Sequence, residues 1–141
     1  MTALADGGMV SCFANIEGQC IVVKIDDDGN FAWGEKGIVA LDGISCFRAQ
    51  LVPCHHEGFW VMAYDEQALR LRYYHSDGTP GGKQITLSES DSVNVVFGQM
   101  VLDDDNNVFA VYMKEKWAVS YYYNKKICVA KYSPEGEQLT S

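Results

Sequence analysis

The residues best suited to contact a partner are clustered between positions 114 and 126. This segment holds four lysines and four aromatic residues, in a chain whose formal net charge is −8. Aromatic rings with polar ends suit sugars, peptides and protein surfaces, and lysines favour an acidic or hydroxyl-rich partner. The alternative is that these rings pack on a neighbouring part of the fold or on a second copy. We predict a partner-binding surface at Lys116, Trp117, Tyr121, Tyr122 and Tyr123.

Three other clusters contain metal-ligand residue types. The acidic run 26–28 superficially resembles a calcium loop, but Lys24 stands two residues before it, where such a loop needs an oxygen ligand. The acidic and amide run 103–107 is explained by the preference of Asp and Asn for turns. His55 and His56 are adjacent on an expected turn, and adjacent side chains rarely point at one ion. We assign no metal site and no cofactor.

Catalysis has little support in the sequence. There is no nucleophile elbow and no glycine-rich phosphate loop before a helix, and no spacing selects a pair of carboxylates for acid–base work. The five cysteines show no zinc-like spacing, and most sit among apolar residues as small hydrophobes. Cys12 and Cys20 flank a tight turn, which leaves a disulfide between them open. No catalytic residue is assigned.

Length and composition indicate an ordinary folded domain, or a piece of a larger one. The chain has 141 residues, of which 48% are hydrophobic and 21% charged, so it can bury a core and is not expected to be disordered. No run of about eighteen apolar residues is present to span a membrane. Since an acidic chain repels phosphate backbones, nucleic acid is not an expected partner.

The sequence repeats itself about every fifty residues. Each unit contains an apolar strand, a turn, a second apolar strand and a turn with glycine, and the anchors Val10, Phe59 and Phe109 begin the first of these strands. The glycines that align the three units are Gly29, Gly78 and Gly136. Unit three has eight extra residues between anchor and glycine, which lengthen the hairpin that holds the aromatic segment. A fixed period of this size is typical of repeat architectures.

Each unit also has a short apolar piece before the hairpin and another after the glycine turn. Four short strands per unit, with Gly, Asp and Asn at the turns and no segment of sustained helical periodicity, predict an all-β chain. We predict a β-propeller-like fold of three four-stranded blades, an incomplete ring within this chain. The chain is one propeller segment, with blades at about 1–48, 49–98 and 99–141.

Residues 21–38 resemble a known repeat. The sequence Ile-Val-Val-Lys-Ile-Asp-Asp-Asp-Gly-Asn-Phe-Ala-Trp-Gly-Glu-Lys-Gly-Ile is similar to the repeat of bacterial secreted and surface β-propeller proteins, with Trp33 four residues after Gly29. Unit two keeps Gly78 but has Gly82 at the position of the tryptophan, and unit three keeps only Gly136. The resemblance implies a propeller with a scaffold or binding role, and it implies no catalytic residue.

Three blades do not close a ring, because propellers have about four to eight. We therefore expect a longer native chain or a homo-oligomer, in which two copies could complete six blades. The predicted function is a non-catalytic scaffold or binding module for a protein or glycan partner. The alternative is a glycan-acting enzyme with its active site on the propeller axis. Localisation is open: the resemblance suggests the cell envelope or secretion, and a native start at Met1 would suggest the cytoplasm.

Overall fold

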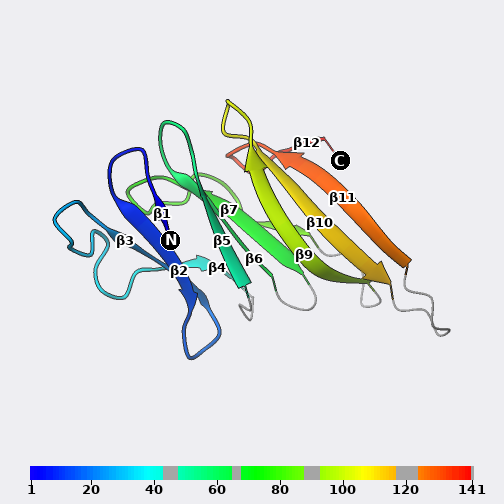
Figure 1. Cartoon of the computed structure of the whole chain (residues 1–141), viewed down its shortest axis with the longest axis horizontal. Coiled ribbons are helices and arrows are strands. Elements are labelled where there is room, and N and C mark those ends of the chain that lie inside the picture. Colours follow the sequence, from blue (N-terminus) through cyan, green and yellow to red (C-terminus); the bar gives the residue numbers. More distant parts are fainter. Residues whose placement is uncertain (43–47, 65–67, 88–92, 117–123, 141) are drawn as a thin grey trace.

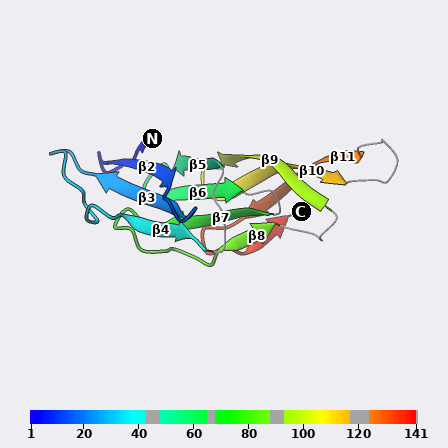
Figure 2. The same ribbon diagram turned by 90° about the horizontal axis from the view of Figure 1, so that it is seen from below.

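A computed structural model describes residues 1–42, 48–64, 68–87, 93–116 and 124–140. The described residues form twelve strands and no helix, and so include no helix able to cross a membrane. The strands build three four-stranded antiparallel sheets, which lie side by side along the long axis of the molecule (Figures 1 and 2). The predicted all-β, propeller-like arrangement of three four-stranded blades is confirmed.

Each sheet is one blade, and its strands follow one another in chain order. Blade 1 contains β1 (Thr2–Ala3), β2 (Met9–Ala14), β3 (Cys20–Ile25) and β4 (Ile38–Leu41). Blade 2 contains β5 (Arg48–Pro53), β6 (Phe59–Tyr64), β7 (Leu69–Tyr74) and β8 (Ile85–Leu87). Blade 3 contains β9 (Val93–Leu102), β10 (Val108–Lys116), β11 (Asn124–Tyr132) and β12 (Gln138–Thr140).

The repeated glycine closes the turn after the third strand of each blade. Gly29, Gly78 and Gly136 have φ of 83°, 88° and 88°, a left-handed conformation that costs glycine little. Each donates its N–H to the carbonyl three residues earlier, at 2.8 to 3.0 Å. The turn therefore explains why the sequence repeats a glycine at this point, and we call it the Gly turn.

Strand register corrects one of the sequence anchors. Val10 pairs with Lys24 and Phe109 with Lys131, but the residue at the equivalent position of blade 2 is Trp60, which pairs with Tyr73. Phe59, the expected anchor, lies one residue earlier and points to the opposite face of its sheet. The shift arises because blade 2 joins its two central strands with one residue fewer than blade 1 does.

Every blade has two faces that follow from this register. The forward face points toward the next blade in the chain, and the back face points toward the previous one. Forward-face residues of the three blades are Val10, Val22 and Lys24; Trp60, Leu71 and Tyr73; and Phe109, Val129 and Lys131. Back-face residues are Met9, Val23 and Ile25; Phe59, Arg72 and Tyr74; and Val108, Ala130 and Tyr132.

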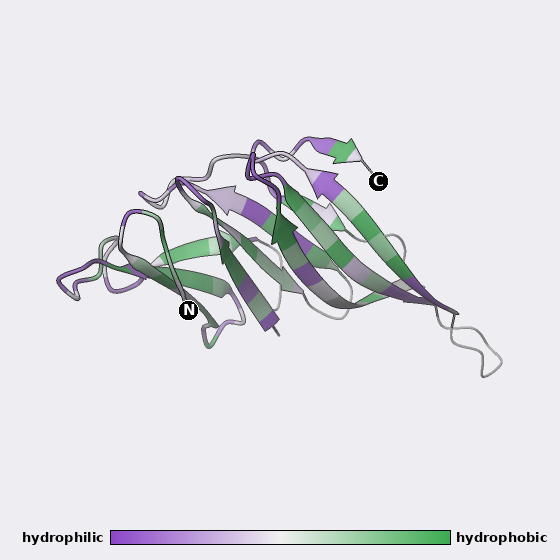
Figure 3. Cartoon of the chain, turned by 45° about the horizontal axis from the view of Figure 1, so that its top comes forward, coloured by the Kyte–Doolittle hydropathy of each residue, from purple (hydrophilic) through white to green (hydrophobic). Residues whose placement is uncertain are grey.

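The core consists of two apolar layers between the blades. One joins the forward face of blade 1, including Val10 and Val22, to the back face of blade 2 around Phe59. The other joins Trp60 and Leu71 of blade 2 to the back face of blade 3. Hydrophobic residues accordingly lie along the middle of the strands, while the turns are hydrophilic (Figure 3). Blade 2 is covered on both sides, as a sheet with two apolar faces requires.

The segment after each Gly turn also packs on the next blade. Trp33 stacks on Phe59 with ring centroids 6.0 Å apart and lies so close to Gly78 that a Cβ there would stand 2.9 Å from the indole. Gly82 replaces this tryptophan in blade 2, and its Cβ position is 2.3 Å from the carbonyl oxygen of Pro134 in blade 3. The backbone of the third Gly turn thus occupies the space that an indole ring would need.

Candidate functional site

The central hairpin of blade 3 is longer than its counterpart in blade 2. The pairing of β6 with β7 ends at Tyr64 opposite Leu69, which matches Met113 opposite Ile127 in blade 3. Beyond that point β10 and β11 continue through the pairs Lys114–Lys126, Glu115–Lys125 and Lys116–Asn124. The extra length predicted for unit three therefore includes ordered strand pairs that extend past the hairpin of blade 2.

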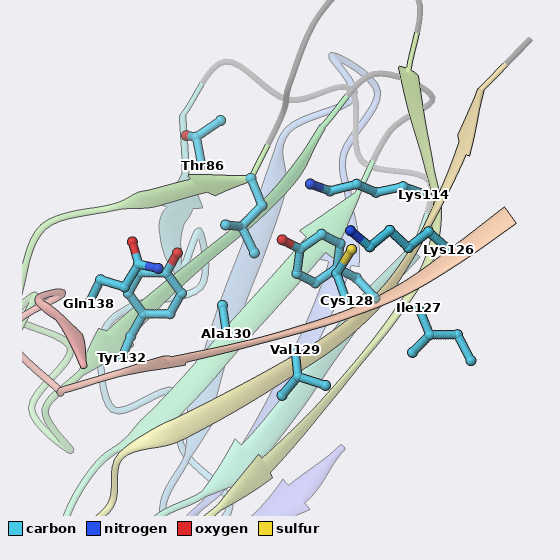
Figure 4. A pocket seen from close by; sticks show the side chains of 11 residues that line it. Thr86, Lys114, Lys126, Ile127, Cys128, Val129, Ala130, Tyr132 and Gln138 are labelled. Carbon is cyan, nitrogen blue, oxygen red and sulfur yellow. The ribbon is translucent and has the colours of Figure 1, made fainter. Parts of the chain in front are cut away.

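A groove of about 720 Å³ lies where blade 3 passes beyond blade 2 (Figure 4). One side is formed by β8 of blade 2 and the other by β10, β11 and β12 of blade 3. The lining residues are Thr86, Leu87, Tyr112, Lys114, Lys126, Ile127, Cys128, Val129, Ala130, Tyr132 and Gln138. Ile127 and Val129 line the groove only with their part of β11, because their side chains point to the opposite side of that strand (Figure 4).

Two lysines stand side by side at one end of this groove. Lys114 and Lys126 face each other across the β10–β11 pairing, and their ammonium groups point in the same direction (Figure 4). The Lys114 Nζ lies 5.5 Å from the centre of the Tyr112 ring, a cation–π contact. Directly opposed like charges destabilise a strand pair. The pair brings two positive charges to this end of the groove.

Neutral polar groups occupy the other end. Tyr132 and Gln138 lie next to each other, with Thr86 across from them on β8 (Figure 4). Burial raises the pKa of the Tyr132 hydroxyl, and the nearby Tyr112 raises it further, so this hydroxyl remains protonated and can donate a hydrogen bond. The groove can bind an anionic and hydroxylated group by its ammonium, hydroxyl and amide groups.

One of the predicted site residues falls within the described part of the chain. Lys116 ends β10 and pairs with Asn124. Trp117, Tyr121, Tyr122 and Tyr123 lie outside the described residues, in the connection between β10 and β11. Sequence reasoning placed Lys114 and Lys126 in the same segment without assigning them to the site. Successive side chains of a strand point to opposite faces of the sheet, and this alternation along the two strands of the hairpin could have placed both lysines on one face.

A second polar cluster, missed from the sequence, surrounds Glu57. Its carboxylate accepts hydrogen bonds from the Tyr73 hydroxyl at 2.7 Å and from the Ser76 N–H at 2.6 Å, and the His75 Nδ1 lies 2.9 Å away. Burial alone would raise the pKa of Glu57, but these hydrogen bonds outweigh it and lower the pKa. The cluster fixes the turn after β5 to the Gly turn of its own blade.

Nucleophilic chemistry is not favoured around Glu57. Burial, and to a lesser degree the Glu57 charge, raises the pKa of the Cys54 thiol to about 12, so it stays protonated at neutral pH. Burial likewise raises the pKa of the Tyr73 hydroxyl, and its bond to Glu57 adds to the shift. Neither group is activated, and we assign this cluster a structural role.

The acidic runs act as turn formers. Asp26 Oδ1 accepts hydrogen bonds from the N–H groups of Asp28 and Asn30, and Asp103 Oδ1 accepts them from Asp105 and Asn107. Among the residues that the structure describes, no three His, Cys, Asp or Glu side chains are grouped to hold a metal ion.

No disulfide joins the cysteines in the described part of the chain. They are Cys12, Cys20, Cys54 and Cys128. The disulfide that the sequence left open does not form in this structure, because Cys12 pairs with Val22 and Cys20 with Ala14, so the two thiols are not directly opposite. Cys46 lies outside the described residues.

Comparisons with known proteins do not assign the chain to a family. No protein-family model, no curated protein sequence and no solved structure matches the chain.

Proposed function

We propose that the protein is a non-catalytic, propeller-like binding module. Its partner is an anionic molecule, with the chemistry that an acidic glycan or an acidic protein segment presents. The observation that carries the proposal is the pair of ammonium groups of Lys114 and Lys126 at the end of the groove between blades 2 and 3.

Charge distribution supports an anionic partner. The whole chain has a formal net charge of −8, so it repels anions over most of its surface. Four of its lysines nevertheless lie between positions 114 and 126, and two of these line the groove. A cluster of lysines on an otherwise acidic surface determines where an anion binds and how it is oriented. The predicted partner-binding residues Lys116, Trp117 and Tyr121–Tyr123 belong to the same segment of the sequence.

A paired-variant binding experiment tests this function. The probes are a uronic-acid oligosaccharide, a neutral oligosaccharide of equal length and a poly-glutamate peptide. We expect a charged probe to bind the unmodified protein, with affinity that falls as salt rises. The double variant K114Q/K126Q should lose affinity about tenfold or more, which corresponds to about 1.4 kcal/mol.

The control is a double variant with the same change in net charge, K36Q/R48Q, whose two side chains are exposed and do not line the groove. It should bind like the unmodified protein. Preference between the two charged probes distinguishes a glycan from a protein partner. Equal loss in both double variants, or binding of the neutral sugar alone, would overturn the proposal.

We further propose that the module assembles with a second copy, and that its repeats are related to those of bacterial secreted and surface β-propellers. Three blades in one chain and the arrangement of Trp33 after the Gly turn support these two statements. Light scattering tests the first, as described in the Discussion. The second predicts that related sequences will repeat the strand, Gly turn and tryptophan in every blade.

A further inference from the structure

The interface between blades is made twice in this chain, and the two versions share their geometry. In both, a forward face covers a back face, and the segment after one Gly turn covers the Gly turn of the next blade. A Cβ at Gly78 would meet the Trp33 ring at 2.9 Å, and one at Gly136 would meet the Lys83 Cγ at 2.7 Å. These two contacts define what a complete blade interface looks like in this protein.

Hydrogen bonds run across both interfaces in the same region. Lys24 on the forward face of blade 1 donates to the carbonyl oxygen of Ser76, in the Gly turn of blade 2, at 2.8 Å. The Lys83 N–H donates to the carbonyl oxygen of Glu135, in the Gly turn of blade 3, at 3.2 Å. In both interfaces a main-chain carbonyl of the next Gly turn accepts a hydrogen bond, from a forward-face lysine in the first and from the main chain after the Gly turn in the second.

The back face of blade 1 is only partly covered, because Ile21 and Val23 on it are 6% and 7% exposed whereas other apolar residues remain open. Its exposed apolar residues are Met9, Phe13 and Val39, which are between 42% and 46% exposed. Strand pairing places all three on the same side of the sheet. A Cβ added at Gly29, in the Gly turn of this blade, would have open space around it to 4 Å, whereas its counterparts in blades 2 and 3 are covered. Part of this face, together with its Gly turn, is therefore open in the described structure.

Blade 3 presents the complementary uncovered forward face. Val101, Ile127 and Val129 are between 49% and 73% exposed, and pairing places them on one side of the sheet with Phe109. Lys131 stands at the position of Lys24 in this face, with its Nζ 2.7 Å from Asp103 Oδ2 and 4.9 Å from the Phe109 ring centre. An ammonium group has three donors, so Lys131 can contact Asp103 and a further acceptor.

We propose that the forward face of blade 3 in one copy docks on the back face of blade 1 in a second copy, head to tail. This inference rests on the proposed assembly with a second copy and states which surfaces meet. The two open faces are one forward face and one back face, the same two kinds of face that pair between neighbouring blades inside the chain. Their charges also match, because Lys131 would face the acidic Gly turn of Asp26, Asp27 and Asp28. By the Lys24 precedent, Lys131 donates to the main-chain carbonyl of Asp27, two residues before Gly29.

The head-to-tail geometry predicts complementation between two variants. V129E blocks only the forward face of blade 3, and F13E blocks only the back face of blade 1. Both side chains are exposed, so each variant should keep the far-ultraviolet circular dichroism of the parent. Each alone should run as a monomer in light scattering. Mixed in equal amounts they should form a heterodimer, because one retains the back face and the other retains the forward face.

The remaining outcomes separate this inference from the proposed assembly. If the unmodified protein is a dimer but the two variants do not combine, the head-to-tail inference is wrong. A dimer formed by either variant alone also overturns it. A monomeric unmodified protein overturns both the inference and the proposed assembly. If one variant fails to fold, V101E and V39E replace V129E and F13E, because they lie on the same two faces.

Discussion

At the scale of residues, the contact between Trp33 and Gly78 ties blade 1 to blade 2. Gly78 needs to be glycine for two separate reasons: its φ is 88°, and a Cβ would stand 2.9 Å from the indole. Gly34 has almost the same φ, 86°, but open space around it. The two positions therefore allow backbone strain to be separated from packing.

We expect G78A to destabilise the protein more than G34A. Both substitutions place alanine in the left-handed region, which costs about 1–2 kcal/mol. G78A should add at least about 1 kcal/mol, since it displaces the packed Trp33 ring. Urea unfolding followed by tryptophan fluorescence measures the difference. Equal free energies of unfolding for the two variants would show that Trp33 does not pack on this turn.

Asp103 provides a pH-dependent contribution to blade 3. The Lys131 ammonium group, followed by the Asn107 side chain, lowers the pKa of this carboxyl group from 3.8 to about 2. Because the folded-state pKa lies below the unfolded one, this stabilisation is present above about pH 4 and is lost as the pH falls toward 2.

D103N should therefore lower the urea midpoint at neutral pH and have progressively less effect as the pH falls from 4 to 2. D104N, in the same turn, serves as the control and should leave the midpoint unchanged at every pH. Midpoints measured across this pH range decide the matter. A D103N deficit that persists at pH 2 would mean that the turn depends on the shape of the side chain and not on its charge.

At the scale of elements, the sequence predicted strands well because their signals are local. Alternating apolar residues and a left-handed glycine act within a few positions, so the three hairpins and their Gly turns could be placed. The first half of β9 has a weaker signal, since residues 93–98 include an asparagine and a glycine that are unusual in a strand. Glycine suits position 98, because a Cβ added there would lie only 2.2 Å from the Leu69 Cδ1 of blade 2.

The groove could not be predicted from local signals. It requires that β10 and β11 extend past the hairpin of blade 2 and that β8 stands opposite them. Which strand of one blade faces which strand of the next is a matter of packing between units fifty residues apart. The sequence identified the aromatic and basic segment, and the fold assigned Lys114 and Lys126 of that segment to one groove with Tyr132.

The long hairpin of blade 3 gives a prediction at this scale. If its aromatic residues bind a partner, the double variant W117A/Y122A should lose about 2 kcal/mol or more of binding free energy with little change in melting temperature. Thermal melting and a titration with the charged probe measure both quantities on the same samples. A large loss of stability would show instead that these rings pack on the fold or on a second copy.

At the scale of the whole molecule, the protein is an arc of three blades with two unlike open ends. Blade 2 is covered on both faces, whereas blade 1 and blade 3 each leave apolar residues exposed on one face. Exposed sheet faces and strand edges are aggregation hazards unless something covers them. Burying apolar surface contributes about 25 cal/mol per Å², so closing the arc with a second copy would stabilise both copies.

The molar mass of the unmodified protein in solution tests most directly whether the two open ends cover each other. Light scattering at micromolar concentration should give twice the 15.7 kDa of one chain, as expected for two arcs that cover each other's open faces. Dilution should return the monomer without loss of β structure in circular dichroism. A stable mass of 15.7 kDa at every concentration would contradict this assembly, because the open faces would then be stable in water without a partner.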